Sequence, residues 1–256
     1  LVGIEYRHPK AKNDRPIVLV GKGVCFDSGG INIKSDPRSM KGDMAGAAVV
    51  FGILRAAALL ELPIHLVAMA PFVYNMPSGS AYVPDDVIVS YSGKTVEIGN
   101  TDAEGRLILA DVLSYAVEKY NPELIVDYAT LTGACVTALG TDIAGVFTSA
   151  MDAEGEDWEL TRMFVKAGQE TDEPHWPLPL YEPYWEKMKS NIANMNNIAS
   201  DSWGGAITAA LFLKQFVGNT PWKHIDIAGP DIFAKSKRFW PEGASGFGVR
   251  SGVEFL

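Results

Sequence analysis

Cysteine and histidine are scarce in this sequence. The 256 residues include two cysteines, Cys25 and Cys135, which lie on separate apolar segments. Two such cysteines do not provide the disulfide framework that stabilises many small secreted domains, so we expect a protein of the reducing cytoplasm. The histidines are scattered without the spacing of a metal-binding motif, and we expect core or surface roles for them. They are His8, His65, His175 and His224.

Basic residues and long apolar runs are also scarce. The sequence has 22 lysines and arginines against 31 aspartates and glutamates, which gives a net charge of −9. Nucleic acids and anionic membranes are bound by basic surfaces, so we expect neither as a partner. The longest apolar run, residues 45–60, is interrupted by Gly46, Gly52 and Arg55, and we expect no membrane-spanning segment.

The sequence does contain a regular alternation of strand-like and helix-like segments. Its length suits one large α/β domain or two small ones, and its 47% of hydrophobic residues is typical of a globular protein. Apolar, β-branched segments predict strands, and amphipathic or small-residue segments predict helices. The predicted strands are 16–24, 65–73, 123–131, 143–149 and 224–229, with a hairpin at 87–99. The predicted helices are 44–60, 104–120, 132–139, 155–170, 204–216 and 248–256.

This order of segments predicts the fold class. Strands that alternate with helices form a three-layer α/β/α sandwich with a largely parallel, mixed central sheet. The proline- and aromatic-rich segment 173–185 is expected to be a loop, and Asp226, in the last strand, is expected to have a structural role. Ligand sites in such sheets lie beyond the carboxyl ends of the strands, where the polar clusters of this sequence fall.

Four acidic residues follow predicted strands in glycine-rich loops: Asp27, Asp43, Asp102 and Glu104. Carboxylates gathered at one edge of a sheet repel one another unless a cation neutralises them. Asp102 and Glu104 are two positions apart, so in extended backbone they point to the same side. Hard divalent cations take such oxygen ligands, and Zn²⁺ and Mn²⁺ accept them too. From the spacing alone, surface acids and helix caps are an equally good interpretation.

Two lysines lie close to these acids in the sequence. Lys22 follows an apolar strand, and beside divalent cations it can lose its proton and become a nitrogen ligand, because burial and nearby positive charge both lower a lysine pKa. Lys34 lies between Asp27 and Asp43, and in its protonated form it can stabilise a developing oxyanion. The simpler alternative for each is a salt-bridged lysine or one that extends to solvent.

Three sequence blocks resemble the leucyl aminopeptidase family, the two-metal cytosolic exopeptidases. The blocks are VGKGVCFDSGGINIK (20–34), MKGDMAGAA (40–48) and NTDAEGRLILADVLSYA (100–116), and they occur in the order and spacing of that family. The segments ATLTGA, GGAITAALFL and HIDIAGP agree more loosely. The resemblance covers nearly the whole chain but only the catalytic portion of a typical member. We therefore expect residues 1–256 to form a catalytic metallo-aminopeptidase domain without the usual N-terminal domain.

The resemblance implies a role for each matching position. One metal would be held by Lys22, Asp27, Asp43 and Glu104, and the second, more exchangeable metal by Asp27, Asp102 and Glu104. Lys34 would contact the tetrahedral gem-diolate, and Arg106 would bind a bicarbonate ion that relays the proton. The pocket for the first side chain of the substrate would be lined by Met40, Thr130, Leu131 and Gly133.

The resemblance also implies a function. The chain would be a metal-dependent aminopeptidase that hydrolyses an apolar, leucine-like N-terminal residue from peptides, using a hydroxide held between the two cations. The cations would be Zn²⁺ or Mn²⁺, with Mg²⁺ as a further candidate. Members of the family are hexamers, so we expect a cytoplasmic homo-oligomer with a peptide substrate. The alternative is a catalytically weak relative that acts as a binding or scaffold protein.

Overall fold

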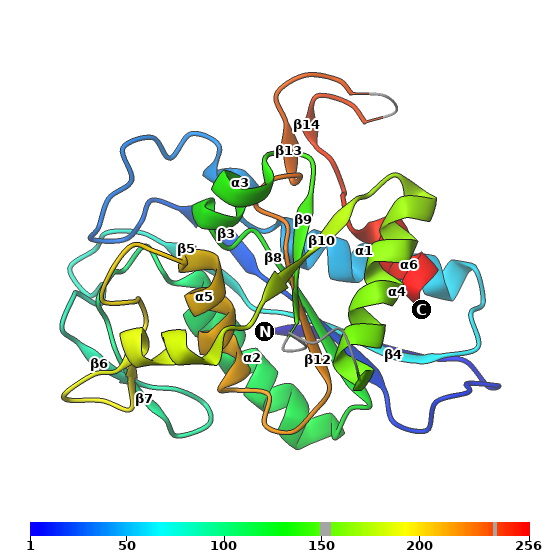
Figure 1. Ribbon diagram of the computed structural model, residues 1–256, viewed down its shortest axis with the longest axis horizontal. Helices are drawn as coiled ribbons and strands as arrows, with labels where there is room; N and C mark the ends of the chain where they lie inside the picture. Colours follow the sequence, from blue (N-terminus) through cyan, green and yellow to red (C-terminus); the bar gives the residue numbers. More distant parts are fainter. Residues whose placement is uncertain (149–154, 238–239) are drawn as a thin grey trace.

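Seven strands of the described residues form the central sheet. The structure is a computed structural model that describes residues 1–148, 155–237 and 240–256 (Figure 1). In spatial order the strands are β1 (Val2–Arg7), β4 (His65–Ala70), β2 (Ile17–Gly21), β8 (Leu124–Ala129), β12 (Trp222–Asp226), β9 (Ala144–Thr148) and β10 (His175–Pro179). The pairs β4–β2, β2–β8, β8–β12 and β9–β10 are parallel, and the pairs β1–β4 and β12–β9 are antiparallel. The sheet is therefore mixed and largely parallel, as predicted.

Helices cover both faces of this sheet, which confirms the predicted three-layer sandwich (Figure 1). One face carries α1 (Ala45–Leu59), α4 (Gly155–Thr171) and α6 (Val249–Phe255). The other carries α2 (Gly105–Tyr120), α3 (Gly133–Leu139) and α5 (Gly205–Lys214). Successive side chains of a strand point to opposite faces, so Val18 and Val20 of β2 pack under α2 and α5, while Leu19 packs under α1. Burial on both faces explains why the strands are continuous apolar runs.

Two predicted strands are each divided into two elements. Segment 16–24 becomes β2 and β3 (Gly23–Asp27), and segment 65–73 becomes β4 and β5 (Phe72–Asn75). The N–H of Lys22 still donates to the carbonyl of Tyr128 in β8, but the carbonyl of Lys22 accepts from the N–H of Ala47 in α1, so the ladder of β2 ends at Gly21. Pro71 has no N–H to donate, so it ends β4. Beyond these breaks, β3 and β5 pair in parallel as a separate small sheet.

The remaining elements are short. The predicted hairpin is formed by β6 (Val87–Val89) and β7 (Thr95–Glu97), and β11 (Met195–Asn196) pairs in parallel with β7. The single-turn helix η1 (Met40–Gly42) precedes α1, and β13 (Ile232–Phe233) pairs with β14 (Gly243–Ala244). Ser149, the last residue of the predicted strand 143–149, lies outside the described residues.

One element prediction is wrong. Segment 173–185, expected to be a loop, contains β10 and the start of η2 (Glu182–Met188). Pro177 and Pro179 lie within β10, which pairs only with β9 at one edge of the central sheet. An edge strand tolerates proline, because a missing N–H on its outer side costs no ladder hydrogen bond. The prolines therefore mark an edge strand instead of a loop.

The first helix is highly apolar in spite of Gly46, Gly52 and Arg55, which interrupt its apolar run. The stretch Met40–Leu59, which comprises η1, the turn at Asp43 and α1, is long and apolar enough to cross a membrane by length and composition alone. In the structure α1 packs over β2, β4 and β8 and against α6, with seven of its residues buried. Its apolar content therefore belongs to the core.

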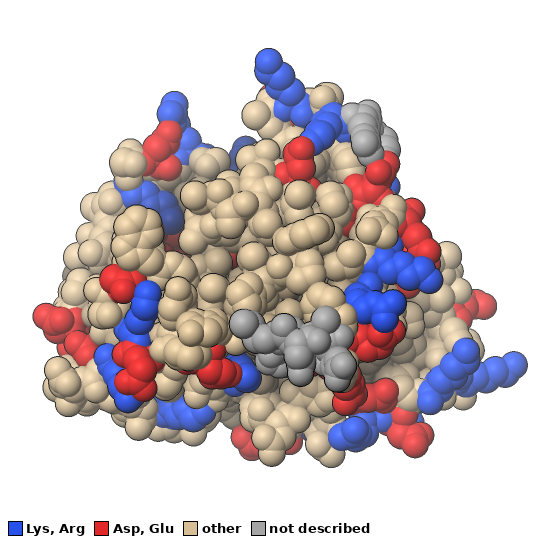
Figure 2. Space-filling model, viewed as in Figure 1, with Lys and Arg blue, Asp and Glu red and all other residues tan. Residues whose placement is uncertain are grey.

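On the face shown in Figure 2, acidic and basic side chains are interspersed around the rim.

Candidate metal centre

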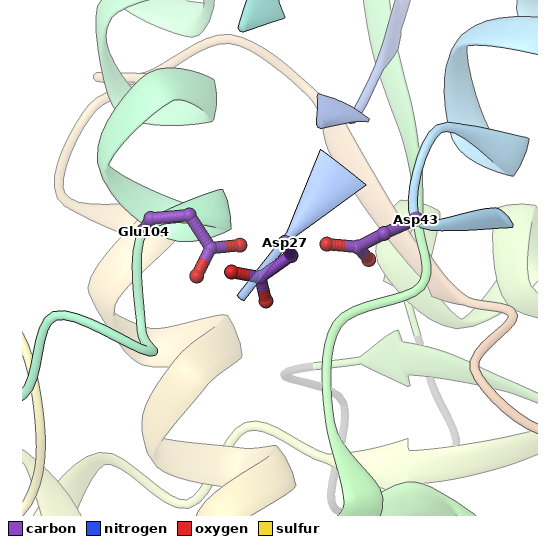
Figure 3. Close-up of side chains that lie close together, drawn as sticks. All are labelled: Asp27, Asp43 and Glu104. Atoms are coloured by element: carbon purple, nitrogen blue, oxygen red, sulfur yellow. The ribbon is translucent and has the colours of Figure 1, made fainter. Parts of the chain in front are cut away.

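Three buried carboxylates meet beyond the carboxyl end of the central sheet. Asp27 ends β3, Asp43 lies between η1 and α1, and Glu104 directly precedes α2. One oxygen of each lies within 4.8 Å of the others, and the three side chains point toward a common centre (Figure 3). The exposed fractions of these residues are only 1%, 7% and 4%. Neither Asp43 nor Glu104 caps its following helix through its side chain, which argues against the simple helix-cap interpretation.

Small residues allow the elements that carry these groups to approach closely. A Cβ atom at Gly21 would lie 2.4 Å from the carbonyl oxygen of Gly46, and one at Gly46 would lie 2.1 Å from that of Tyr128. A Cβ atom at Gly105 would lie 2.5 Å from Cε of Lys22. The start of α1 therefore contacts β2 and β8 directly, and the side chain of Lys22 passes along the start of α2.

Lys22 lies among the carboxylates, where its predicted role as a cation ligand would place it. Its Nζ is 2.8 Å from Oδ1 of Asp43 and 3.2 Å from Oε1 of Glu104, and it donates to the carbonyl of Thr130 at 3.0 Å. Burial lowers the pKa of Lys22, but Glu104 and Asp43 outweigh burial and raise this pKa above its usual value. With these partners the ammonium form is favoured, so a role as nitrogen ligand requires a cation to replace the proton.

Asp43 has an oxygen that the protein does not satisfy. Its Oδ1 accepts from Thr130 Oγ1 at 2.7 Å and pairs with Lys22. Its Oδ2 is buried and has no hydrogen-bond partner among the described residues. Burial raises the pKa of Asp43 to about 6, opposed by Lys22 and reinforced by Glu104. A buried carboxylate oxygen without a donor fits a cation, since such groups otherwise carry a large desolvation cost.

A second lysine joins the remaining acidic residue to the cluster. Lys34 Nζ is 2.9 Å from Oδ2 of Asp27 and 2.6 Å from Oδ1 of Asp102. Burial raises the pKa of Asp102, while Lys34 opposes that effect. For Asp27, burial acts in the same direction, but Lys34 and the N–H of Gly29 bring its pKa below the usual value. Asp102 is thus brought to the site through Lys34 and lies beside the three carboxylates that meet at its centre.

Arg106 lies in the first turn of α2. One terminal nitrogen donates to the carbonyl of Asn197 at 2.7 Å, whereas Nε is buried without a partner in the described part of the chain. Burial lowers the pKa of Arg106 to about 10, with Glu104 and Asp226 opposing. The guanidinium is still charged at neutral pH, and a buried N–H that points to no acceptor fits a bound anion.

The predicted substrate-pocket residues come from two places. Thr130, Leu131 and Gly133 follow β8 and lead into α3, and Thr130 contacts both Asp43 and Lys22. Met40 is half-buried in η1, just before Asp43 in the sequence. Asp226 has the structural role expected of it, because it accepts from the N–H of Leu131 and from Thr132 Oγ1, which caps α3.

Two polar residues of the site, Asn75 and Thr101, were not predicted from the sequence. Asn75 Nδ2 lies 2.8 Å from Asp27 Oδ1 and 3.3 Å from Glu104 Oε2. Thr101 is fully buried, and its Oγ1 donates to the carbonyl of Gly29 at 2.7 Å, which connects the two acidic loops. The position of Asn75, two residues after the apolar run 65–73, was the available signal, since that run ends at the same edge of the sheet.

The fold and this cluster define a class of protein: an α/β/α sandwich with carboxylates and lysines gathered beyond the carboxyl ends of its strands. Comparison with known proteins identifies the family. Residues 1–253 match the model of the cytosol aminopeptidase family, catalytic domain. The chain therefore belongs to the cytosol aminopeptidase family, the family that its motifs resemble.

Individual relatives agree over the whole chain. A probable cytosol aminopeptidase of Geobacter sp. (strain M21) is 52% identical over 258 residues, which cover 100% of this chain and 50% of the relative. One of Cenarchaeum symbiosum (strain A) is 47% identical, covering 100% of this chain and 52% of the relative. The solved structure of the bottromycin maturation enzyme BotP superposes with a TM-score of 0.89 at 39% identity, over 99% of this chain and 53% of that one. Its complex with Mn gives a TM-score of 0.90 at 38% identity, over 99% and 54%. The chain spans about half the length of these relatives.

Proposed function

We propose that residues 1–256 form the catalytic domain of a metal-dependent aminopeptidase, which removes N-terminal residues from peptides. The observation that carries this proposal is the meeting of Asp27, Asp43 and Glu104 within 4.8 Å in a buried site. The unsatisfied Oδ2 of Asp43 supports cation binding there. Membership of the cytosol aminopeptidase family supports the reaction class.

The two proposed ligand sets are those that the family resemblance implies, and the contacts among Lys22, Asp27, Asp43 and Glu104 support them. Lys22, Asp27, Asp43 and Glu104 would hold one divalent cation, and Asp27, Asp102 and Glu104 the second, so that Asp27 and Glu104 are shared. Two such cations lower the pKa of water and polarise the scissile carbonyl. Zn²⁺ and Mn²⁺ both accept this mixture of oxygen and nitrogen ligands, and a bottromycin maturation enzyme of the same fold is known in complex with Mn.

The other groups of the site act directly on the substrate. Lys34, half-exposed beside Asp27 and Asp102, donates a hydrogen bond where negative charge develops on the carbonyl oxygen. Arg106 cannot accept a proton at neutral pH, so its Nε–H, which has no partner among the described residues, would hold a bicarbonate anion that supplies the missing proton acceptor. The pocket formed by Met40, Thr130, Leu131 and Gly133 receives an apolar, leucine-like first side chain. A hexameric assembly and a cytoplasmic location are part of the same proposal and rest on family membership.

The test uses leucine p-nitroanilide and the complete chain. We expect no hydrolysis after removal of cations with EDTA, and recovery when Mn²⁺ or Zn²⁺ is returned. N-acetyl-leucine p-nitroanilide is the matched control, because a blocked amine should prevent cleavage. Two bound cations per chain without any turnover would contradict the proposal and favour a binding or scaffold protein.

A further inference from the structure

Asn75 is placed beside Asp27 by the backbone. The two residues are direct partners in the parallel pair β3–β5, so their side chains lie on the same side of this small sheet. The carbonyl of Asn75 accepts from both the N–H and the Oγ of Ser28, each at 2.9 Å. Only 6% of Asn75 is exposed. Its side chain is therefore held in a fixed place at the edge of the site.

The amide nitrogen of Asn75 faces three acceptors. Its Nδ2 is 2.8 Å from Oδ1 of Asp27, 2.9 Å from the carbonyl of Thr101 and 3.3 Å from Oε2 of Glu104. All three partners only accept hydrogen bonds when the carboxylates are ionised, so the nitrogen, and not the oxygen, of the amide must face them. Two N–H groups thus serve three oxygens, and the longest contact is the one to Glu104.

Asp27 and Glu104 make the same two kinds of contact, one to the Asn75 amide and one to a lysine. In Asp27, Oδ1 faces the amide and Oδ2 faces Lys34; in Glu104, Oε2 faces the amide and Oε1 faces Lys22. Oδ1 of Asp27 also accepts from the N–H of Gly29 at 2.8 Å, which leaves Oδ2 of Asp27 as its oxygen for a cation. Oε2 of Glu104 keeps a further lone pair beside the amide, so Asn75 does not block either carboxylate from binding a cation. It fixes the rotation of both carboxylate planes at once.

We propose that Asn75 is the positioning residue that orients the two shared carboxylates, Asp27 and Glu104, for cation binding. This inference rests on the proposed function, because the shared ligands have meaning only in a two-cation site. Groups that hydrogen-bond to metal ligands orient those ligands, and their loss weakens binding or activity by about 10- to 100-fold. An uncharged donor suits this position, since a lysine would neutralise the carboxylates and an acid would repel them.

A purely structural role for Asn75 makes a different prediction. The contact to the carbonyl of Thr101 could by itself hold the loop before α2. Tyr82 provides the matched control, because its hydroxyl donates to the same carbonyl at 3.1 Å and, among the described residues, makes no hydrogen bond to Asp27 or Glu104. If the loop contact were all that matters, loss of either donor would have similar consequences.

The experiment compares Asn75→Leu with Tyr82→Phe in the complete chain. Leucine is close to asparagine in size and has no donor. We expect Asn75→Leu to weaken binding of the more exchangeable Mn²⁺ by about 10- to 100-fold in titration calorimetry. We also expect a lower kcat at saturating Mn²⁺, with KM for leucine p-nitroanilide changed much less. Tyr82→Phe should stay within about twofold of the wild-type chain in all three quantities.

The outcomes separate this inference from the proposed function. Wild-type Mn²⁺ affinity and kcat in Asn75→Leu would overturn the positioning role while leaving the aminopeptidase intact. A wild-type chain that binds fewer than two cations would instead overturn the proposed function. If Asn75→Leu does not fold, Asn75→Ala, which cannot clash, is measured in its place. A lower melting temperature of Asn75→Ala without cations, together with unchanged Mn²⁺ affinity, would show a structural role and reject the inference.

Discussion

Buried carboxylates occur in two regions of this molecule, and their partners differ. Glu173, which is 1% exposed, accepts at Oε2 from Ser251 N–H, Ser251 Oγ and the N–H of Gly248, and its Oε1 pairs with Arg250. It holds the start of α6 to the segment before β10. In the site cluster (Lys22, Asp27, Lys34, Asp43, Asp102 and Glu104), four carboxylates have only two lysines as ion-pair partners, and Oδ2 of Asp43 has no donor among the described residues.

The difference indicates which region is built for stability and which for binding. A buried carboxylate surrounded by N–H and O–H donors is stabilised by them, and breaking the arrangement leaves an uncompensated charge. Carboxylates that outnumber the cationic side chains beside them repel one another and favour a bound cation. The comparison can be tested by measuring both cation binding and stability in variants of each region. Variants of the site cluster should change cation binding more than stability, and variants at Glu173 should change stability more than cation binding.

The largest effect is expected for Glu104→Ala. Glu104 contacts both Lys22 and Asn75, and in the proposed function it is one of the two shared ligands. Its loss should remove both cations and lower kcat/KM for leucine p-nitroanilide by at least about 10³-fold, since bound cations contribute several kcal/mol to such reactions. The measurement is metal stoichiometry by mass spectrometry together with steady-state kinetics. Retention of two cations per chain would show that Glu104 is not a shared ligand.

The next effect is on stability, in Glu173→Gln. Glutamine keeps the shape but turns an NH₂ group toward donors that need an acceptor, so the free energy of unfolding should fall by about 3 kcal/mol. Denaturant unfolding of the metal-free chain gives this value. Mn²⁺ affinity, measured on the folded variant, should match that of the wild-type chain. A Glu173→Gln chain as stable as wild type would remove the contrast between the two regions.

The contrast between the regions was only partly visible in the sequence. The apolar runs and the motifs around Lys22, Asp27, Asp43 and Glu104 predicted the sandwich, and the structure brings those four residues together. These features depend on local pattern and on the general rule that sites form at the carboxyl ends of strands. The break of segment 16–24 at Lys22 was not predicted, because it comes from a hydrogen bond between the carbonyl of Lys22 and the N–H of Ala47, which belongs to another element.

The features that were missed depend on long-range pairing. Asn75 is 48 positions from Asp27 and meets it only because β3 and β5 pair in register. Glu173, within a segment read as a loop, meets Ser251 across 78 positions. A single polar residue beside an apolar run has many possible partners, and composition does not select among them. The prolines of β10 led to the wrong prediction of a loop, because a strand tolerates proline when it lies at an edge of the sheet, and the sequence does not show that position.

The smallest effect concerns pH and lies in the Glu173 region. His175 is fully buried between Phe164 and Phe247, and its Nδ1 is 2.6 Å from the carbonyl of Glu173. Burial lowers the pKa of His175 to about 4, only partly opposed by that carbonyl. The unfolded chain, with an ordinary histidine pKa near 6.5, therefore binds the proton more readily than the folded chain. The stability contributed by the neutral imidazole is complete above about pH 6.5 and is lost as the pH falls toward 4, by up to about 3 kcal/mol.

Replacing His175 should remove this part of the acid sensitivity. We expect His175→Gln to flatten the dependence of unfolding free energy on pH between about 6.5 and 4, measured by denaturant unfolding of the metal-free chain so that cation release does not contribute. His8→Gln, which changes a half-buried histidine near the N-terminus, is the matched control and should leave the slope unchanged. Equal slopes in wild type and His175→Gln would mean that His175 takes up its proton in the folded chain. The packing of its ring against Phe164 and Phe247 would then not exclude the charged form.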